Sequence, residues 1–323
     1  MLTVRPAGPN DASDICGLMN AVDTAEIGRP ETDLSDVEAD LLHPEVDLAR
    51  DSWLAVEGGR VVAYAVVWCD GDPARIDADH YVLPGHGAAG ERLLALMEAR
   101  ALERAREGGS PTAVLHLNLN IRPTLDTALL TGRGWGRVRR HYVMVRDLAA
   151  GADLPPAPLD GLTLRACETE ADQRSAHALL MDSFSAHFDH QHRSYEQWLD
   201  DLGAPRGAMD WSLVWIAQLA GHGDVAVLLS RDNRAAMGWV RSLGVRADVR
   251  GRGIGGHLLR HAFAVYAARG RDTIGLGVDT LNATGALALY EGQGMRPHYA
   301  VDTWEVTLGD LGRCPGGSLV TAG

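Results

Sequence analysis

The stretch Val249-Arg250-Gly251-Arg252-Gly253-Ile254-Gly255-Gly256-His257-Leu258-Leu259 is the most distinctive part of the chain. The aliphatic and aromatic run at 237–245 precedes it and predicts a β-strand. After it, apolar residues recur at steps of three and four as far as Tyr266, which predicts an amphipathic helix. The sequence therefore predicts a strand that turns through a glycine-rich loop directly into a helix.

This loop has the properties of a phosphate-binding turn. The first N–H groups of a helix have no acceptor within the helix, and the helix dipole adds partial positive charge there. Glycine lets the backbone approach a ligand closely, and Arg250 and Arg252 add fixed positive charge. We therefore expect a phosphate or pyrophosphate group at the start of this helix.

Two common nucleotide-binding motifs do not fit the loop. A nucleotide P-loop ends in Gly-Lys-Ser/Thr, whereas all 30 Lys and Arg residues of this chain are arginine. A dinucleotide fingerprint has the spacing G-x-G-x-x-G, whereas the glycines here follow G-x-G-x-G-G. The ligand is therefore expected to be a phosphate compound of another class.

The spacing Arg-x-x-Gly-x-Gly, formed by Arg250, Gly253 and Gly255, resembles the pyrophosphate loop of the GNAT family of N-acetyltransferases. In that family the loop holds the diphosphate of acetyl-CoA. The resemblance therefore implies that acetyl-CoA, or another acyl-CoA, is the cofactor. It implies cofactor contacts from Leu243, Gly244, Val245, Arg250, Gly251, Arg252, Gly253, Ile254, Gly255, Gly256 and Asn282.

The sequence after the loop extends this resemblance. A predicted strand at 273–278 is followed by Asn282, by Leu289-Tyr290-Glu291 and by Gly294-Met295, in the order found at the end of a GNAT domain. The family's Asn binds the pantetheine arm or shapes the turn, and its Tyr protonates the departing CoA thiolate. Tyr290 is therefore the expected catalytic residue. Asn282 as a helix cap and Tyr290 as a packing residue are the structural alternatives.

The chain repeats its own plan at about the size of a domain. Leu162-Thr163-Leu164-Arg165 repeats Leu2-Thr3-Val4-Arg5, and a strand at 135–147 is expected to close the first copy. The proline-rich run between the copies reads as a stiff linker. The expected divisions are a first domain at 1–148, a linker at 149–160, a second domain at 161–311 and a flexible tail at 312–323.

The first copy has lost part of the motif. Aligning Leu93-Leu94 with Leu258-Leu259 places Gly85 opposite Arg250, and at the other end Leu130 lies opposite Tyr290. The residues of the first copy that correspond to the cofactor loop are Val82, Gly85, Gly87, Ala88, Ala89 and Gly90. The first copy is therefore either an inactive CoA-binding domain or a purely structural one, so one or two acyl-CoA sites per chain are expected.

Two such copies resemble the tandem GNAT proteins of the mycothiol synthase type, some of which occur in natural-product gene clusters such as that of clavulanic acid. The resemblance implies an α/β fold made of two tandem GNAT domains. Each domain is then a mixed, mostly antiparallel sheet flanked by helices, and the second domain is catalytic. It implies an acyltransferase that transfers an acyl group, most simply acetyl, to an amine of a small molecule. Secondary metabolism is one context in which such an enzyme could act.

The acceptor side of this chemistry is less defined. Developing negative charge on the thioester carbonyl would meet a backbone N–H, which we place at Val245. Trp239 stands where the family carries a glutamate base. The expected acceptor-side residues are His187, Asp189, His190 and Trp239. A metal site at the histidines is the weaker reading of that loop, so no metal is predicted.

Three tryptophans, Trp211, Trp215 and Trp239, either shape an apolar acceptor cleft or belong to the core, and the core reading is favoured. The alternative to catalysis, from a different functional class, is a protein that binds or senses acyl-CoA without turnover. The lost motif of the first copy and the missing acid at Trp239 motivate this second hypothesis.

The composition of the 323 residues sets further limits. A net charge of −13 and a pI of about 5.4 disfavour nucleic acid as a partner, because phosphate contacts need a basic face. No apolar run reaches the roughly 18 residues of a membrane span, and no signal-peptide core follows Met1. Four widely spaced cysteines predict neither a disulfide framework nor a metal site. We therefore expect a cytoplasmic protein that does not associate with membranes.

Overall fold

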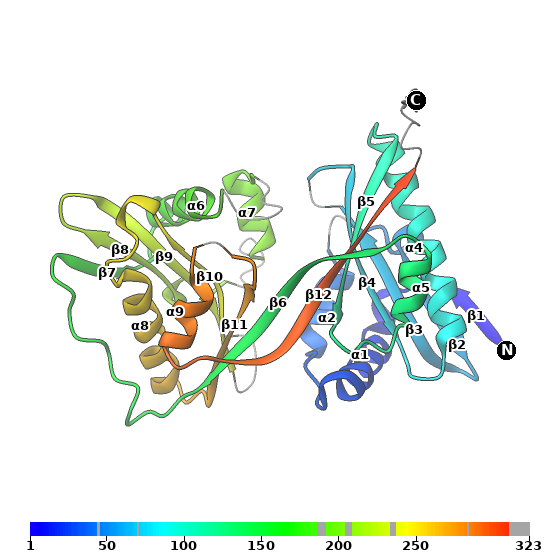
Figure 1. The fold of residues 1–323 in the computed structure, drawn as a ribbon, viewed down its shortest axis with the longest axis horizontal. Helices are drawn as coiled ribbons and strands as arrows, with labels where there is room; N and C mark the ends of the chain where they lie inside the picture. Colours follow the sequence, from blue (N-terminus) through cyan, green and yellow to red (C-terminus); the bar gives the residue numbers. More distant parts are fainter. Residues whose placement is uncertain are drawn as a thin grey trace, which may run out of the picture. The chain divides into compact units, whose positions relative to one another are not determined.

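The computed structural model describes residues 1–43, 46–69, 71–185, 192–203, 209–232, 237–282 and 284–309. The chain forms two compact units (Figure 1). Unit 1 consists of Met1–Arg140 together with Val301–Gly323, and unit 2 consists of His141–Ala300. No helix among the described residues is both long enough and apolar enough to cross a membrane.

Unit 1 is a mixed sheet with helices on both faces. Its elements are β1 (Leu2–Arg5), η1 (Pro9–Asp11), α1 (Ala12–Ile27), α2 (Leu34–Leu41), α3 (Leu48–Asp51), β2 (Ser52–Glu57), β3 (Arg60–Trp68), β4 (Arg75–Val82), α4 (Gly87–Glu107), β5 (Thr112–Asn120), α5 (Thr127–Gly132) and the second part of β12 (Arg296–Gly309). The strand order is β1-β2-β3-β4-β5-β12. Only β4 and β5 run parallel; the other neighbours are antiparallel.

Unit 2 repeats this plan. Its elements are the second part of β6 (Gly136–Asp147), β7 (Leu162–Ala166), α6 (Glu170–Phe184), α7 (Tyr195–Asp201), η3 (Trp211–Leu213), β8 (Val214–Leu219), β9 (Gly223–Arg231), β10 (Met237–Val245), η4 (Ala247–Val249), α8 (Ile254–Ala268), β11 (Thr273–Asp279), α9 (Ala286–Gly292) and the start of β12. The strand order is β6-β11-β10-β9-β8-β7, and only β10 and β11 run parallel.

The closing strands of the two copies are exchanged. β6 comes from the first copy but pairs with β11, from Thr273 opposite Asp147 to Asp279 opposite His141. β12 comes from the second copy but pairs with β5 over 301–309. The strand expected at 135–147 therefore forms, but it does not close the first copy. The compact units consequently differ from the division into 1–148 and 161–311, which followed the order of the chain.

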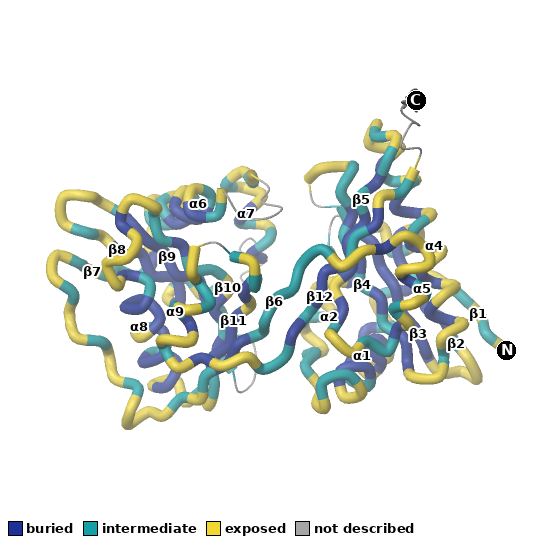
Figure 2. The backbone as a smooth tube through the Cα atoms, viewed as in Figure 1, coloured by how far each residue is buried: buried dark blue, intermediate teal, exposed yellow. Residues whose placement is uncertain are grey.

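The buried residues explain why each closing strand lies where it does. Met144 is fully buried in the core of unit 2, and Val306 is buried in the core of unit 1. An alternating pattern of apolar residues predicts a half-buried strand but does not say which sheet edge the strand will join. Figure 2 shows buried residues along the central strands of each unit.

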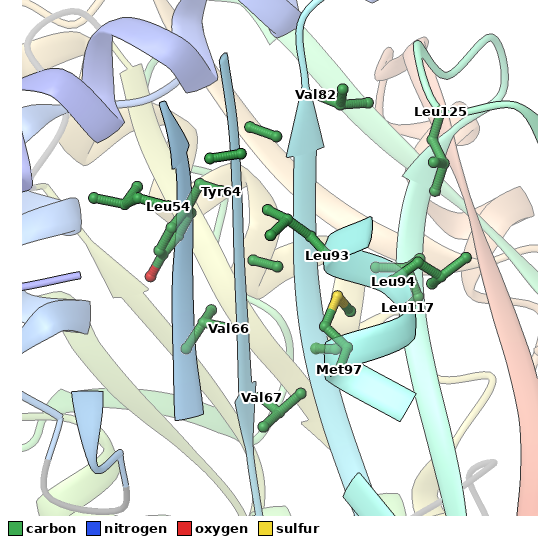
Figure 3. Close-up of a cluster of buried hydrophobic side chains, with 14 of the residues drawn as sticks. Leu54, Tyr64, Val66, Val67, Val82, Leu93, Leu94, Met97, Leu117 and Leu125 are labelled. Carbon is green, nitrogen blue, oxygen red and sulfur yellow. The ribbon is translucent and has the colours of Figure 1, made fainter. Parts of the chain in front are cut away.

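The helix that the apolar periodicity predicted after the glycine-rich loop is present as α8. Leu258, Leu259, Ala262, Phe263 and Tyr266 are all buried, so they form the face of α8 that packs against the sheet of unit 2. In unit 1, the corresponding helix α4 packs its own apolar residues on the sheet, and Figure 3 shows Leu93, Leu94 and Met97 in this core.

Two apolar clusters cover the two faces of the sheet in unit 2. One cluster includes the buried side chains of α8, and the other includes Leu179 and Leu180 of α6 with Trp198 of α7. Trp215 is buried in the first cluster, and Trp211 packs against the second. Both tryptophans are therefore core residues, as the favoured reading expected.

Candidate active site

A gap between two parallel strands creates the site in unit 2. β10 and β11 pair only from Met237 opposite Thr273 to Val240 opposite Leu276. A β-bulge between Val240 and Ser242 then redirects β10, which continues its pairing with β9 while β11 continues along β6. The edge of β10 that faces β11 is therefore unpaired beyond Val240, and it borders a cavity.

The cavity has a volume of about 490 Å³. Its walls are the end of β10, the glycine-rich loop, the end of β11, helix α9, and Ser183 and Phe184 at the end of α6. Of the cofactor residues expected in the second copy, those that line it are Leu243, Gly244, Val245, Arg250, Gly251, Gly253, Ile254, Gly255, Gly256 and Asn282. Arg252 is exposed and does not line the cavity.

The glycine-rich loop reaches helix α8 through two left-handed residues. Gly251 has a φ of +78°, and Gly253, the N-cap of α8, has a φ of +79°. A side chain at either position would strain the backbone. The first turn of α8 therefore starts at Ile254, and the N–H groups of this turn have no acceptor within the helix. This end of the cavity is consequently suited to an anion.

Arg250 ties the loop to its surroundings. Its Nε donates a hydrogen bond to the carbonyl oxygen of Val245 at 3.0 Å, and an Nη donates to the carbonyl oxygen of Ser183 at 3.5 Å. The guanidinium thus links the loop to both β10 and α6. Because it also lines the cavity, Arg250 combines a structural role with the positive charge expected from the sequence.

Tyr290 lines the same cavity from helix α9. Its side chain is 8% exposed, and burial raises the pKa of its phenol to about 12. The phenol is therefore neutral at physiological pH. Within the described part of the chain, no recorded hydrogen bond uses this hydroxyl, which leaves it available to a ligand in the cavity.

Asn282 shapes the turn before α9. Its Oδ1 accepts a hydrogen bond from the backbone N–H of Thr284 at 2.7 Å and another from the Thr284 hydroxyl. Helix α9 begins only at Ala286, so Asn282 stabilises the preceding loop rather than capping the helix itself. It also lines the cavity, where its amide remains close to any bound ligand.

A histidine and an aspartate of the cavity were not predicted from the sequence. His141 of β6 and Asp279 of β11 lie opposite each other in the antiparallel pair, and both line the cavity. Such partners have Cβ atoms about 4.5–5.5 Å apart. His141 was missed because its strand was assigned to the first copy, and no local motif marks it.

Ser183 of α6 is a third unpredicted residue. It is buried, its hydroxyl makes no hydrogen bond to a described residue, and it lines the cavity beside Gly244. A Cβ at Gly244 would lie 2.9 Å from the Cβ of Ser183, so only glycine fits at that point of β10. This close approach brings α6 to the cavity wall.

Of the residues expected on the acceptor side, only Trp239 is among the described residues. Trp239 packs across Gly275 on the neighbouring strand, where a Cβ would lie 2.9 Å from its ring, and it does not line the cavity. His187, Asp189 and His190 lie outside the described residues. Among the residues that are described, no group of three His, Cys, Asp or Glu side chains could hold a metal ion.

The corresponding loop of unit 1 differs mainly in its charge. Gly85 has a φ of +85°, and the N–H groups of Ala89 and Gly90 donate to the carbonyl oxygen of His86, much as the N–H of His257 donates to Gly253 in unit 2. The imidazole of His86 lies 3.0 Å from a carboxylate oxygen of Glu57, which places negative charge at the helix start. Val82, Ala89 and Gly90 are buried, whereas Gly85, Gly87 and Ala88 are exposed.

Comparison with known proteins assigns the family. Residues 173–295, within unit 2, match the model of the acetyltransferase (GNAT) family. This matched part of unit 2 belongs to the GNAT family. The chain is 28% identical to a GCN5-related N-acetyltransferase from Sphaerobacter thermophilus, with a TM-score of 0.80 over 95% of each chain.

Other relatives extend the similarity. A mycothiol acetyltransferase from Beutenbergia cavernae is 36% identical over 177 residues, which are 51% of this chain and 57% of that relative. The match therefore spans little more than half of that relative's length. A mycothiol acetyltransferase from Thermobispora bispora is 26% identical over 75% of this chain and 78% of its own.

The fold matches a solved tandem GNAT protein as well. The tandem GNAT protein from the clavulanic acid biosynthesis pathway superimposes with a TM-score of 0.69 over 95% of this chain and 98% of its own, at 19% identity. The predicted fold class, two tandem GNAT domains with mixed sheets and flanking helices, is confirmed.

Proposed function

We propose that the chain is an acyl-CoA-dependent N-acyltransferase whose active site is the 490 Å³ cavity of unit 2. The observation that carries this proposal is that a glycine-rich helix start and a buried, neutral phenol line one cavity. The first suits the diphosphate of CoA, and the second suits its sulfur. Acetyl is the simplest acyl group to expect.

The cofactor is held along the cavity in this proposal. Its diphosphate binds the N–H groups at the start of α8, and its pantetheine arm enters the gap between β10 and β11, where the edge of β10 has no strand partner beyond Val240. A backbone N–H on that edge, at Val245 as the sequence suggested, stabilises negative charge on the thioester oxygen. Asn282 faces the same arm.

The transfer step requires two proton movements. The neutral amine attacks the thioester carbon, the C–S bond breaks, and the sulfur leaves with the bonding electron pair. The attacking nitrogen gives up one proton as the amide forms, and this proton balances the negative charge of the departing thiolate. Tyr290 donates a hydrogen bond to that sulfur. Because the pKa of this phenol is about 12 and that of a thiol about 8.5, stabilising the thiolate by a hydrogen bond is easier than full proton transfer.

An amine that arrives as an ammonium ion must first lose a proton. His141 is the base that we propose for this step, because it lines the cavity and its cross-strand partner Asp279 can stabilise the imidazolium that forms. The acceptor is proposed to be the amine of a small molecule. The two relatives named as mycothiol acetyltransferases support this class of acceptor.

The decisive experiment measures thiol release from acetyl-CoA with a panel of small amines. We expect turnover, and we expect Tyr290→Phe to lower it at least about tenfold because the hydrogen bond to sulfur is lost. Tyr195→Phe is the matched control: its hydroxyl bonds Gln173 and lies outside the cavity lining, so turnover should be unchanged. Equal activity of Tyr290→Phe and the parent protein would contradict the assigned role.

The second candidate is an acyl-CoA-binding protein without turnover. It is motivated by Trp239, which stands where the family carries a glutamate base, and by the absence of any acid among the described cavity residues of β10. Native mass spectrometry separates the two candidates: tight acyl-CoA retention without thiol release for any amine favours the second. The same spectra count the cofactors. One per chain is favoured, since the loop of unit 1 has Gly85 in the place of Arg250 and carries the carboxylate of Glu57 beside His86.

A further inference from the structure

Unit 1 contains a cavity of its own, with a volume of about 220 Å³. It lies on the face of the sheet opposite α4. His80 and Val82 of β4 contact Gly90 of α4, so the alternation of side chains puts Asp79 on the other face, where it lines the cavity. Figure 3 shows the Tyr64 hydroxyl pointing away from Leu93 of α4, and Tyr64 also lines the cavity.

The walls of this cavity are largely apolar and include two aromatic rings. The apolar lining residues are Met19, Val37, Val46, Tyr64, Val66 and Trp68. The volume is below the roughly 300–1,000 Å³ of pockets for drug-sized ligands. The cavity therefore fits only a small, compact molecule.

The polar lining residues bring negative charge and no permanent positive charge. They are Asp40, His43 and Asp79. Among the residues that the structure describes, no arginine lines the cavity, and the chain has no lysine. Asp79 makes no recorded hydrogen bond to a described residue. Burial, followed by the charges of Asp40 and Asp77, raises the pKa of Asp79 to about 7.

An ionised carboxylate that faces an apolar cavity is stabilised by a cation, because without one it tends to take up a proton, as the raised pKa of Asp79 indicates. Aromatic faces beside carboxylates are the usual surroundings of an organic ammonium ion. A metal ion fits less well, since Asp40, His43 and Asp79 do not form one of the three-residue groups that could hold a metal. An anion would be repelled by the two carboxyl groups.

We propose that this cavity of unit 1 binds a small organic ammonium ion, with its charge at Asp79 and its apolar body between Trp68 and Val37. The site is separate from the proposed acyl-CoA cavity, so a test of one site does not decide the other. It gives the copy that lacks the intact cofactor motif a binding function of its own.

Binding of an ammonium ion at this site should become tighter as pH rises. The titratable groups around Asp79 are Asp40 and His43 at and after α2, Tyr64 on β3, Asp77 and Tyr81 on β4, and Asp23 on the packed helix α1. The ammonium ion requires ionised Asp79, so below a pH of about 7 it must displace a proton. Affinity is therefore expected to rise by up to about tenfold per pH unit between pH 5 and 7, and then to level off.

The test is isothermal titration calorimetry of the full chain with benzylammonium chloride and with butylammonium chloride. We expect one site per chain, tighter binding at pH 8 than at pH 6, and no comparable binding of neutral benzyl alcohol. Asp79→Asn should weaken ammonium binding at least about tenfold, because the amide keeps the shape but not the charge. Tyr290→Phe, in the other cavity, should leave it unchanged.

Several outcomes would overturn the proposal. These are the absence of binding by both ammonium ions, equal binding of benzyl alcohol, and binding that survives Asp79→Asn. Folding of the variant is checked separately. The raised pKa of Asp79 means that wild-type stability falls as pH rises from about 4 to 7, so Asp79→Asn should unfold at a higher temperature than the parent at pH 8.

Discussion

Single residues of the site differ in how far sequence alone could place them. Gly253, Gly255 and Tyr290 line the cavity where the motif predicted them, because their spacing fixes their positions on a turn and a short helix. The sequence left two roles open for Asn282, a cofactor-side residue or a helix cap. In the structure it stabilises the turn before α9 and lines the cavity. No role was predicted for His141, because its position depends on which sheet edge its strand joins.

His141 provides the residue-scale prediction. We expect His141→Gln to lower amine acetylation about 100-fold, because the glutamine cannot accept the proton of an ammonium substrate. The variant should regain activity as pH rises toward the pKa of the amine substrate, because an amine that is already neutral needs no base. Initial rates across pH 5.5–8.5 check this.

The control for this prediction is His222→Gln, an exposed histidine in the loop between β8 and β9. It should keep the parent rate and pH profile. Acetyl-CoA binding by His141→Gln should also persist, since the imidazole is assigned to the acceptor side. An unchanged pH profile in His141→Gln would remove the histidine from the mechanism.

At the scale of elements, helix α6 shows how local sequence builds a wall of the site. Its N-terminus is a capping box in which Thr169 bonds the Asp172 backbone and Asp172 bonds back. Its other end carries Ser183 and Phe184 into the cavity wall. Both the start of the helix and its core face could be predicted from sequence, but the contact of Ser183 with Gly244 could not, because it depends on how α6 packs.

Asp172 provides the element-scale prediction. Hydrogen bonds from Arg165 and then Thr169 lower the pKa of this carboxyl to about 2. Its contribution to stability is therefore present above pH 4 and is lost as pH falls toward 2. Asp172→Asn should cost about 1–2 kcal/mol of unfolding free energy at pH 7 and almost nothing at pH 2.

Urea denaturation at several pH values measures this difference. Asp147→Asn is the matched control: Asp147 pairs with Arg296, but the two side chains are 72% and 57% exposed, so the pair should contribute little. A loss of the same size for both variants, or a loss at Asp172 that does not depend on pH, would contradict the assigned cause.

At the scale of the whole molecule, the repeat was visible in the sequence but the exchange of strands was not. The repeated Leu-Thr-Val/Leu-Arg start and the linker indicated two copies along the chain. The pairing partner of a closing strand is a long-range choice between two similar sheet edges, β5 and β11. Side-chain alternation is the same in either case, so periodicity cannot decide it.

The exchange makes a prediction about fragments. Residues 136–300 contain every strand of unit 2, whereas 161–311 lacks β6 and leaves β11 with an open edge. We expect the fragment 136–300 to be monomeric and to retain acetyl-CoA in native mass spectrometry. The fragment 161–311 should aggregate, because an unpaired edge strand recruits other chains. Equal behaviour of the two fragments would contradict the pairing of β6 with β11.

The place of β12 also sets the order in which the protein matures on the ribosome. The sheet of unit 1 is complete only when Val301–Gly309 has emerged, although its other strands are translated first. The nascent N-terminal half must therefore wait, with β5 uncovered, while the later half is synthesised and folds. The half that is made first is finished last, so a ribosome that stalls shortly before codon 301 would release a chain with a completed second unit and an unfinished first one.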